Sequence, residues 1–342
     1  MTAMQLTTAG PSGAPTPLLM GGAGVGPGPA PPSSCLLFFE GDQILDEDTR
    51  EELGDALLSP QAHLDAMVAK AGPGAWVGVV GPSRVTPEGF SAYENLLPRL
   101  TATGEPIGYD ARGYKAGTHL ASLLSTASSA CSSSGSSITA PGHPPPQLLL
   151  LGLPLTLVGF SKAGTVLNQV LIEMAAHEAH AAGGGAAGGA PPAAQPRPSP
   201  TASSAPERAP SDAARVLDSV TQVHYLDAGL NGAGVHMTDA RHAESLGARS
   251  IRIPLTVAFH GTPRQWNDRR RPWIAAEKDR SVAVLRAAAA AAAGIEEGGG
   301  SGSRLTVTER VYFEGPGQRP SLRQHFEVIG AAELQLGVRA QL

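Results

Sequence analysis

Apolar runs of strand length alternate with segments of helical periodicity along most of the chain. Six runs predict buried strands, because each is rich in apolar residues and most are bounded by Gly, Pro or Asp: 35–39, 76–80, 155–158, 222–226, 250–259 and 305–313. Five other segments predict helices: 48–58, 93–100, 117–124, 165–180 and 273–293. Strands that alternate with helices predict a mostly parallel sheet covered by helices on both faces.

Four low-complexity stretches interrupt this pattern, and they are rich in Gly, Pro, Ala, Ser and Thr: 1–34, 125–147, 181–210 and 294–303. Ordering a backbone costs roughly 1–2 kcal/mol per residue, and such segments bury too little apolar surface to offset it. We therefore expect a disordered tail over 1–34, one domain over 35–330 with the other three stretches as disordered inserts, and a C-terminal tail over 331–342. The remaining residues, about 250, suit a single hydrophobic core.

Charge and cysteine content exclude several classes of partner. The formal net charge of −5 gives no basic surface for nucleic acid, and no apolar run approaches the roughly 20 residues that cross a bilayer. The two cysteines, Cys35 and Cys131, form no disulfide framework or zinc pair, which favours a reducing compartment. No basic residue precedes Arg50, so there is no clear presequence and a cytoplasmic location stays open. We expect no cofactor and no metal.

The sharpest chemical signal is the sequence Gly159-Phe160-Ser161-Lys162-Ala163, which lies between an apolar strand and a helix. In a nucleophile elbow, a serine occupies the tight turn from strand to helix, and the residues two before and two after it must be small. Gly159 and Ala163 meet this requirement. A serine that caps an ordinary helix is the alternative. The pattern favours an α/β-hydrolase fold with Ser161 as the nucleophile.

Such a serine also needs backbone N–H groups that stabilise the oxyanion of the transition state. The N–H of Lys162, at the start of the predicted helix, is one candidate. The second donor should come from the loop after the first predicted strand, which holds Gly41, Asp42 and Gln43.

A histidine must take the serine's proton, and a carboxylate must orient that histidine. The chain order in this fold is serine, acid, histidine, which favours His325 in the loop after the last predicted strand. Asp227 directly follows a predicted strand, and Asp268 lies past the next one, so either could be the acid. His260 could line the site or replace His325 as the base, although a buried structural role suits it better.

A run of three arginines, Arg269 to Arg271, lies between Trp266 and Trp273, with Arg264 nearby. It could bind an anionic acyl carrier or a phosphate, but a solvated loop is the simpler interpretation. An RNA-associated role would use the same arginines, and the net negative charge disfavours it.

These motifs together resemble the mitochondrial α/β-hydrolase-like family typified by human chromosome two open reading frame sixty-nine. The resemblance covers about residues 36–329 without the inserts, and it is most specific in Leu157 to Lys162 with Val166 to Gln169, in Tyr225 to Gly229, in Thr262 to Gln265 with Asp268 and Arg271 to Ile274, and in Gln324 to Phe326. The family has Gly where this chain has Ala163 and Ala228. The resemblance implies a hydrolase-like fold and a mitochondrial location.

The leading hypothesis is a serine hydrolase that acts on an ester, thioester or amide. Ser161 would attack the acyl carbon of a small-molecule substrate, His325 would move the proton, and Asp227 or Asp268 would orient His325. The rival is a catalytically inactive, hydrolase-like protein that binds a partner or serves as a scaffold, because a fold alone does not confer activity.

Overall fold

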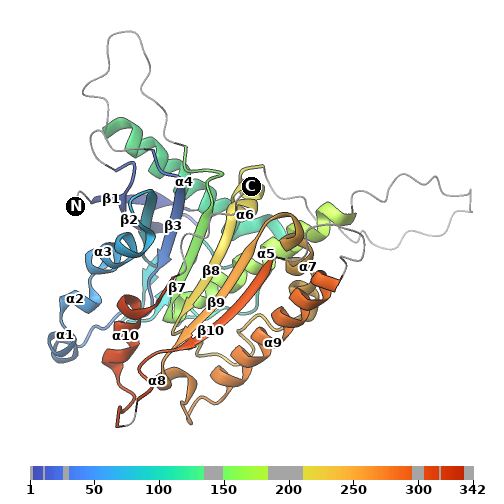
Figure 1. The fold of residues 1–342 in the computed structure, drawn as a ribbon. Helices are drawn as coiled ribbons and strands as arrows, with labels where there is room; N and C mark the ends of the chain where they lie inside the picture. Colours follow the sequence, from blue (N-terminus) through green and yellow to red (C-terminus); the bar gives the residue numbers. More distant parts are fainter. Residues whose placement is uncertain are drawn as a thin grey trace, which may run out of the picture.

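The computed structural model describes residues 3–10, 12–25, 31–134, 149–183, 211–294, 304–315 and 317–334. Its centre is a twisted eight-stranded sheet (Figure 1). In spatial order the strands are β1 (Met4–Ala9), β2 (Pro15–Gly22), β4 (Ala75–Val80), β3 (Ser34–Phe39), β7 (Leu155–Phe160), β8 (Val220–Leu226), β9 (Leu255–Gly261) and β10 (Leu305–Val311). β2 is antiparallel to both β1 and β4, and all pairs from β4 to β10 are parallel. A separate pair, β5 (Arg84–Val85) and β6 (Ser91–Ala92), forms a short hairpin.

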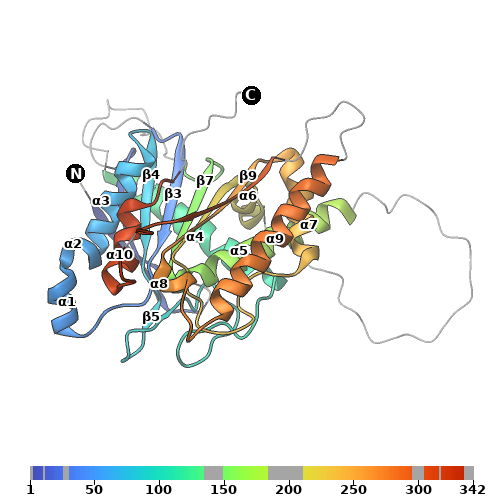
Figure 2. The same ribbon diagram turned by 60° about the horizontal axis from the view of Figure 1, so that its bottom comes forward.

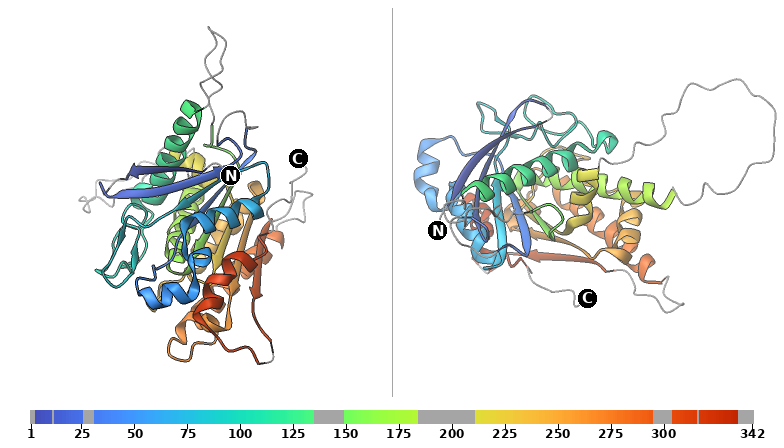
Figure 3. Two further views of the ribbon diagram at one scale, coloured as in Figure 1. Left: turned by 90° about the vertical axis from the view of Figure 1, so that its left-hand side faces the viewer. Right: turned by 90° about the horizontal axis from the view of Figure 1, so that it is seen from above.

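Helices cover both faces of the sheet (Figures 2 and 3). One face carries α1 (Glu47–Leu53), α2 (Asp55–Leu58), α3 (Pro60–Ala71) and α10 (Leu322–Ala331). The other carries α4 (Lys115–Ser134), α5 (Gly164–Gly183), α6 (Ser211–Ser219), α7 (Ala240–Arg252) and α9 (Trp273–Ala293). The short helix α8 (Pro263–Trp266) follows β9, and 3-10 turns lie at Arg112–Tyr114 and Ser161–Ala163.

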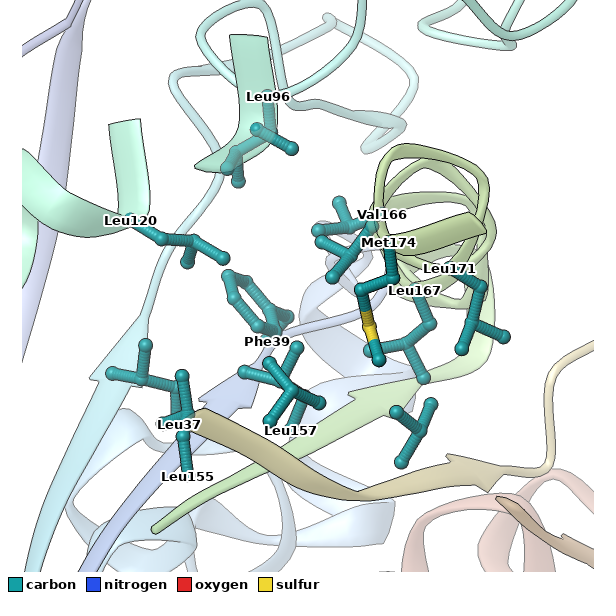
Figure 4. Packing of buried hydrophobic residues seen from close by; sticks show 14 of the residues in the cluster. Leu37, Phe39, Leu96, Leu120, Leu155, Leu157, Val166, Leu167, Leu171 and Met174 are labelled. Atoms are coloured by element: carbon teal, nitrogen blue, oxygen red, sulfur yellow. The ribbon is translucent and has the colours of Figure 1, made fainter. Parts of the chain in front are cut away.

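The two cores follow from the two-residue period of the strands. In β3, Leu37 and Phe39 pack on the α4–α5 side, and Leu36 and Phe38 pack on the α3–α10 side. Figure 4 shows Leu37 and Phe39 beside residues of β7 and α5 in the first core. Because all four side chains are buried, β3 reads as a continuous apolar run rather than an alternating one.

The parallel strands from β3 to β10 end at one edge of the sheet, and helices cover both faces. This is the α/β-hydrolase fold, and the prediction from the sequence is confirmed. In the part of the chain that the structure describes, no helix is both long and apolar enough to span a bilayer.

The prediction of a disordered tail over 1–34 is wrong for the residues described there. β1 and β2 form a hairpin that extends the sheet through β4. Thr16, Leu18 and Met20 alternate as buried residues along β2. The surrounding Gly and Pro hid this two-residue period, and pairing with β4 supplies the hydrogen bonds that an isolated hairpin lacks.

Five other predictions from the sequence are also corrected. Residues 93–100 form turns rather than a helix, and residues 250–252 end α7 rather than begin a strand. The tail expected from residue 331 still holds the last residue of α10, and His325 lies on that helix rather than in a loop. The insert predicted over 125–147 begins later, since α4 continues to Ser134. Residues 135–147, 184–210, 295–303 and 335–342 lie outside the described residues.

Candidate active site

Ser161 lies where β7 turns into α5. Its φ of 52° is in the left-handed region, which a residue with a side chain adopts only when its surroundings hold it there. A Cβ atom on Gly159 would lie 2.8 Å from the Leu167 side chain and 2.9 Å from the Ala163 carbonyl oxygen, so only glycine fits at that position. Ala163 is itself fully buried. The small residues around Ser161 are therefore required by packing across the turn.

The loop after β3 packs directly on Ser161. A Cβ atom on Gly41 would lie 2.7 Å from the Ser161 Cβ, so the glycine lets the loop backbone reach the serine. Ser91 holds this loop, because its N–H donates to Asp42 Oδ1 at 2.8 Å and its hydroxyl donates to the Gly41 carbonyl at 2.7 Å. The Gln43 N–H already donates to the Gly89 carbonyl. Gly41 and Asp42 therefore remain the candidate N–H donors of this loop.

His325 and Asp227 form a buried pair at the same edge of the sheet. His325 Nδ1 lies 2.6 Å from Asp227 Oδ2, which fits a short N–H···O hydrogen bond to a carboxylate. The aspartate is fully buried and the histidine is 6% exposed. These residues are 98 positions apart in the chain, so only the fold brings them together.

Thr262 fixes the Asp227 carboxylate. Its N–H donates to Oδ1 at 2.7 Å and its hydroxyl donates to Oδ2 at 2.9 Å. Asp227 has a φ of 44°, and its N–H donates to the His260 carbonyl. The carboxylate is thus held by two donors besides the histidine, which restricts the direction in which it faces His325.

α10 positions His325 relative to the serine turn. The helix begins with a capping box of Ser321 and Gln324, which fixes its first turn. The His325 ring packs on the Phe160 ring with centroids 4.6 Å apart, and Phe160 directly precedes Ser161. Within the described residues, neither Ser161 Oγ nor His325 Nε2 makes a hydrogen bond. The structure therefore forms the acid–histidine pair, and within the described residues no hydrogen bond joins that histidine to Ser161.

Two other predicted site residues have different partners. Asp268 accepts hydrogen bonds from the side chain of Arg271 and the N–H of Arg270, and no hydrogen bond or ion pair joins it to His325. Arg271 also binds Asn231 and Gln265, so Asp268 anchors the loop near residue 231. Asp227, rather than Asp268, is the carboxylate at His325.

His260 belongs to a buried chain of hydrogen bonds behind the site. Its Nδ1 lies 2.9 Å from the Tyr312 hydroxyl and its Nε2 lies 3.1 Å from His224 Nδ1, while His224 Nε2 lies 3.0 Å from Gln222 Oε1. Burial lowers the pKa of His260 to about 4 and that of His224 to about 3, with the neighbouring His260 contributing to the latter. His260 therefore has a structural role, and it connects β8 and β9 to Tyr312, the residue after β10.

Sequence reasoning missed Thr262 as a site residue, and it missed the role of the Lys162 side chain. Thr262 was named only as part of a family motif. Its position directly after β9, at the edge of the sheet where the site lies, was the signal that could have identified it. Lys162 was expected to contribute only its backbone N–H, but its side chain is buried beside Asp42 and Glu105. No sequence pattern distinguishes a buried lysine from a solvated one.

A small pocket opens beside the serine turn. It is lined by Glu40, Gly41, Asp42, Gln43, Ile44, Arg50, Leu58, His63, Phe160 and Phe326. The Nε2–H of the buried His63 donates to the Leu57 carbonyl at 3.0 Å, and its Nδ1 lies 3.0 Å from Glu40 Oε1. Within the described ranges, no group of three or more His, Cys, Asp or Glu residues is placed to hold a metal ion.

Several solved esterase structures resemble this one at low sequence identity. The siderophore hydrolase EstB from Aspergillus nidulans is 11% identical, with 96% of this chain and 92% of that chain covered and a TM-score of 0.42. The carboxylesterase Cest-2923 from Lactobacillus plantarum is also 11% identical, with 95% and 91% covered and a TM-score of 0.42. The assignment of the fold rests on the order and direction of the strands.

Sequence comparisons show a similarity to one family. The family model described as C2orf69 matches residues 146–291. The mitochondrial protein C2orf69 homolog of Danio rerio is 25% identical over 258 residues, which is 75% of this chain and 60% of that protein. The homolog of Mus musculus is 26% identical over 183 residues, 54% of this chain and 36% of that protein. With the motifs around Ser161, Asp227 and His325 placed at one edge of the sheet, these matches show that the chain is similar to the C2orf69 proteins at low identity.

Proposed function

We propose that this chain is a serine hydrolase that cleaves an ester, thioester or amide, with Ser161, His325 and Asp227 as its catalytic triad. The observation that carries the proposal is the buried 2.6 Å contact between Asp227 Oδ2 and His325 Nδ1. That contact fixes the ring tautomer and leaves Nε2 as the nitrogen that can accept a proton.

In this mechanism the turn at Ser161 is a nucleophile elbow. The Ser161 oxygen attacks the acyl carbon while its proton moves to His325 Nε2, and the carbonyl becomes an oxyanion. His325 then gives the proton to the leaving group as the bond to that group breaks. Water hydrolyses the acyl–serine ester by the same route and restores the serine. Hydrogen bonds between a catalytic serine and its histidine are often long before substrate binds, and they tighten in the complex with substrate.

The oxyanion would accept hydrogen bonds from the N–H of Lys162 and from Gly41 or Asp42. The close packing of Gly41 on Ser161 supports this assignment. Loss of one such donor typically lowers kcat by about 10²- to 10³-fold.

A fluorophosphonate probe tests the mechanism, since it reacts only with an activated serine. We expect the wild-type chain to be labelled and to hydrolyse p-nitrophenyl esters of short acids, and Ser161→Ala to do neither. Thermal unfolding of both proteins controls for misfolding. Equal labelling of wild type and Ser161→Ala would refute the proposal.

The second candidate function is a catalytically inactive hydrolase-like protein with a binding role. Two observations favour it: the serine–histidine hydrogen bond is absent among the described residues, and the carboxylate of Asp42 lies in the loop that would stabilise an oxyanion. In that case Ser161→Ala would support cell function as well as wild type does.

We also propose a mitochondrial location, because both curated relatives are named mitochondrial proteins. Fractionation of cells that express the full-length tagged protein tests it. Recovery in the mitochondrial fraction, protected from added protease, is the expected result, and recovery in the cytosol would contradict it.

A further inference from the structure

Resting on the hydrolase function above, we propose that the side-chain ammonium of Lys162 is a positioning and charge-balancing group for the oxyanion site. It holds the loop of residues 41–43 beside Ser161, and it offsets the negative charge that Asp42 brings to this loop. A nucleophile elbow requires only the backbone N–H of this residue. The chemistry of the triad therefore does not explain why a lysine side chain is buried here.

The contacts of Lys162 are those of a charged group held in place. Its side chain is 2% exposed, and Nζ lies 3.2 Å from Glu105 Oε1 and 3.8 Å from Asp42 Oδ1. The ammonium also donates to the Thr103 carbonyl and lies 5.0 Å from the centre of the Phe90 ring. Removing an ammonium from water is costly, so a lysine is buried only where such partners compensate it. These partners place its charge at a defined point beside the serine.

The partners of Lys162 connect it to the oxyanion loop from two directions. Asp42 is in the loop itself, and Thr103 and Glu105 are in a tight turn closed by hydrogen bonds between residues 101 and 105. This turn packs on Ser91, since a Cβ atom on Gly104 would lie 2.5 Å from the Ser91 carbonyl oxygen. Ser91 in turn holds Asp42 and the Gly41 carbonyl. Lys162 and Ser91 thus both contact Asp42 Oδ1, and together they hold the loop.

Electrostatics give the ammonium its second role. Burial raises the pKa of the Asp42 carboxyl, and the charges of Lys162 and His325 lower it. Asp42 is therefore within electrostatic range of the proposed base. An ionised carboxylate here would raise the energy of an oxyanion on the adjacent serine, since like charges in a poorly solvated site repel strongly. The Lys162 ammonium opposes that repulsion.

A matched control exists elsewhere in the chain. The side chain of Lys278 is 8% exposed, its Nζ contacts Glu309 at 2.6 Å and Asp279 at 2.5 Å, and it lies 4.2 Å from the centre of the Trp266 ring. It therefore has the same kinds of partners as Lys162, but it is on α9 and contacts neither Ser161 nor the 41–43 loop. Lys278→Met measures the cost of losing a buried ammonium without touching the site.

The experiment measures kcat and KM for p-nitrophenyl butyrate, and unfolding by urea, for six proteins: wild type, Ser161→Ala, Lys162→Met, Lys162→Arg, Lys162→Met with Asp42→Asn, and Lys278→Met. We expect Lys162→Met to lower kcat on the order of 10- to 100-fold with KM changed less than about threefold. Lys162→Arg keeps the charge and should retain most of kcat. Adding Asp42→Asn to Lys162→Met should restore kcat about tenfold, because the excess negative charge is gone.

Each outcome is decisive. Lys278→Met should lose stability and keep its kcat. If Ser161→Ala is as active as wild type, the hydrolase function fails and the role of Lys162 fails with it. If Ser161→Ala is inactive and Lys162→Met has the kcat of wild type, only the role of Lys162 fails. If Lys162→Met does not fold, the test uses Lys162→Met with Asp42→Asn, because that double variant restores the charge balance. If the double variant folds and is no more active than Ser161→Ala, the proposal is overturned.

Discussion

Gly41 and Ser161 are in contact across the carboxyl ends of β3 and β7, and a Cβ atom on the glycine would lie 2.7 Å from the serine Cβ. The same atom would lie 2.9 Å from the Phe160 ring. Real Cβ atoms do not approach this closely, so any side chain at residue 41 moves either the loop or the serine. This contact determines the position of the loop that we assign to the oxyanion.

Gly41→Ala should therefore separate activity from stability. We expect esterase kcat to fall by about 100-fold, because a displacement near 1 Å suffices for such a loss. The stability cost of overpacking should stay within about 1–3 kcal/mol. Gly330→Ala is the control, since a Cβ atom there would meet nothing within 4 Å. Wild-type kcat in a folded Gly41→Ala protein would contradict the assignment of this loop.

The two candidate acids can be compared directly. Asp227→Asn keeps the shape of the side chain but removes the charge that orients His325, and in serine hydrolases such a change lowers kcat by about 10⁴-fold. Asp268→Asn should change kcat less than about threefold, because its carboxylate binds Arg271 rather than His325. Steady-state kinetics on a p-nitrophenyl ester give both values. A larger loss in Asp268→Asn would mean that the wrong acid has been assigned.

The buried chain from Gln222 to Tyr312 predicts a loss of stability in acid. The Glu333 N–H donates to the Tyr312 oxygen, so the tyrosine hydroxyl donates to His260 Nδ1. His260 Nε2–H then donates to His224, which donates to Gln222. Every ring nitrogen is satisfied when both histidines are neutral, and a proton added to either ring has no acceptor.

The sign of the pH effect follows from the lowered pKa values, about 4 for His260 and about 3 for His224. Between these values and 6.5, the unfolded chain binds protons that the folded chain does not, so stability falls as the pH falls. Each histidine contributes a slope of up to about 1.4 kcal/mol per pH unit. The free energy of unfolding, measured with urea from pH 7 to 4.5, should fall less steeply with decreasing pH for His224→Gln than for wild type. His180→Gln, on the last turn of α5, should keep the wild-type slope.

Asn168 connects the segments behind the serine turn, and we expect Asn168→Asp to lower the stability of the fold. Its Oδ1 accepts from the Tyr225 hydroxyl at 2.6 Å, and its Nδ2 donates to the Val235 carbonyl at 2.8 Å and the Tyr109 hydroxyl at 3.1 Å. In Asn168→Asp a carboxylate oxygen would face that carbonyl in a buried site. We expect a loss of about 3 kcal/mol in urea unfolding. The exposed Asn267→Asp is the control, and equal stability of the two variants would contradict this account.

The sequence alone was informative where local chemistry dictates structure. The apolar run before Gly159, the small residues around Ser161 and the helix after them predicted the turn, because those features act within about ten residues. Each strand and helix was likewise recognisable from its own local pattern, and their alternation along the chain predicted the parallel sheet. Residues 4–22 were misread, because β2 is stabilised mainly by pairing with β4, some 60 positions later.

Only the tertiary structure decided which acid meets the histidine and what Lys162 does. Asp227 and Asp268 both follow strands, and local sequence cannot rank them, because the choice depends on where α10 places His325. The same holds for Lys162, whose partners come from loops after β3 and β6. Hydrogen bonds between residues far apart in the chain depend on distances that the packed sheet and helices set. A sequence therefore specifies the side chains available for such a site, and the fold selects which of them meet.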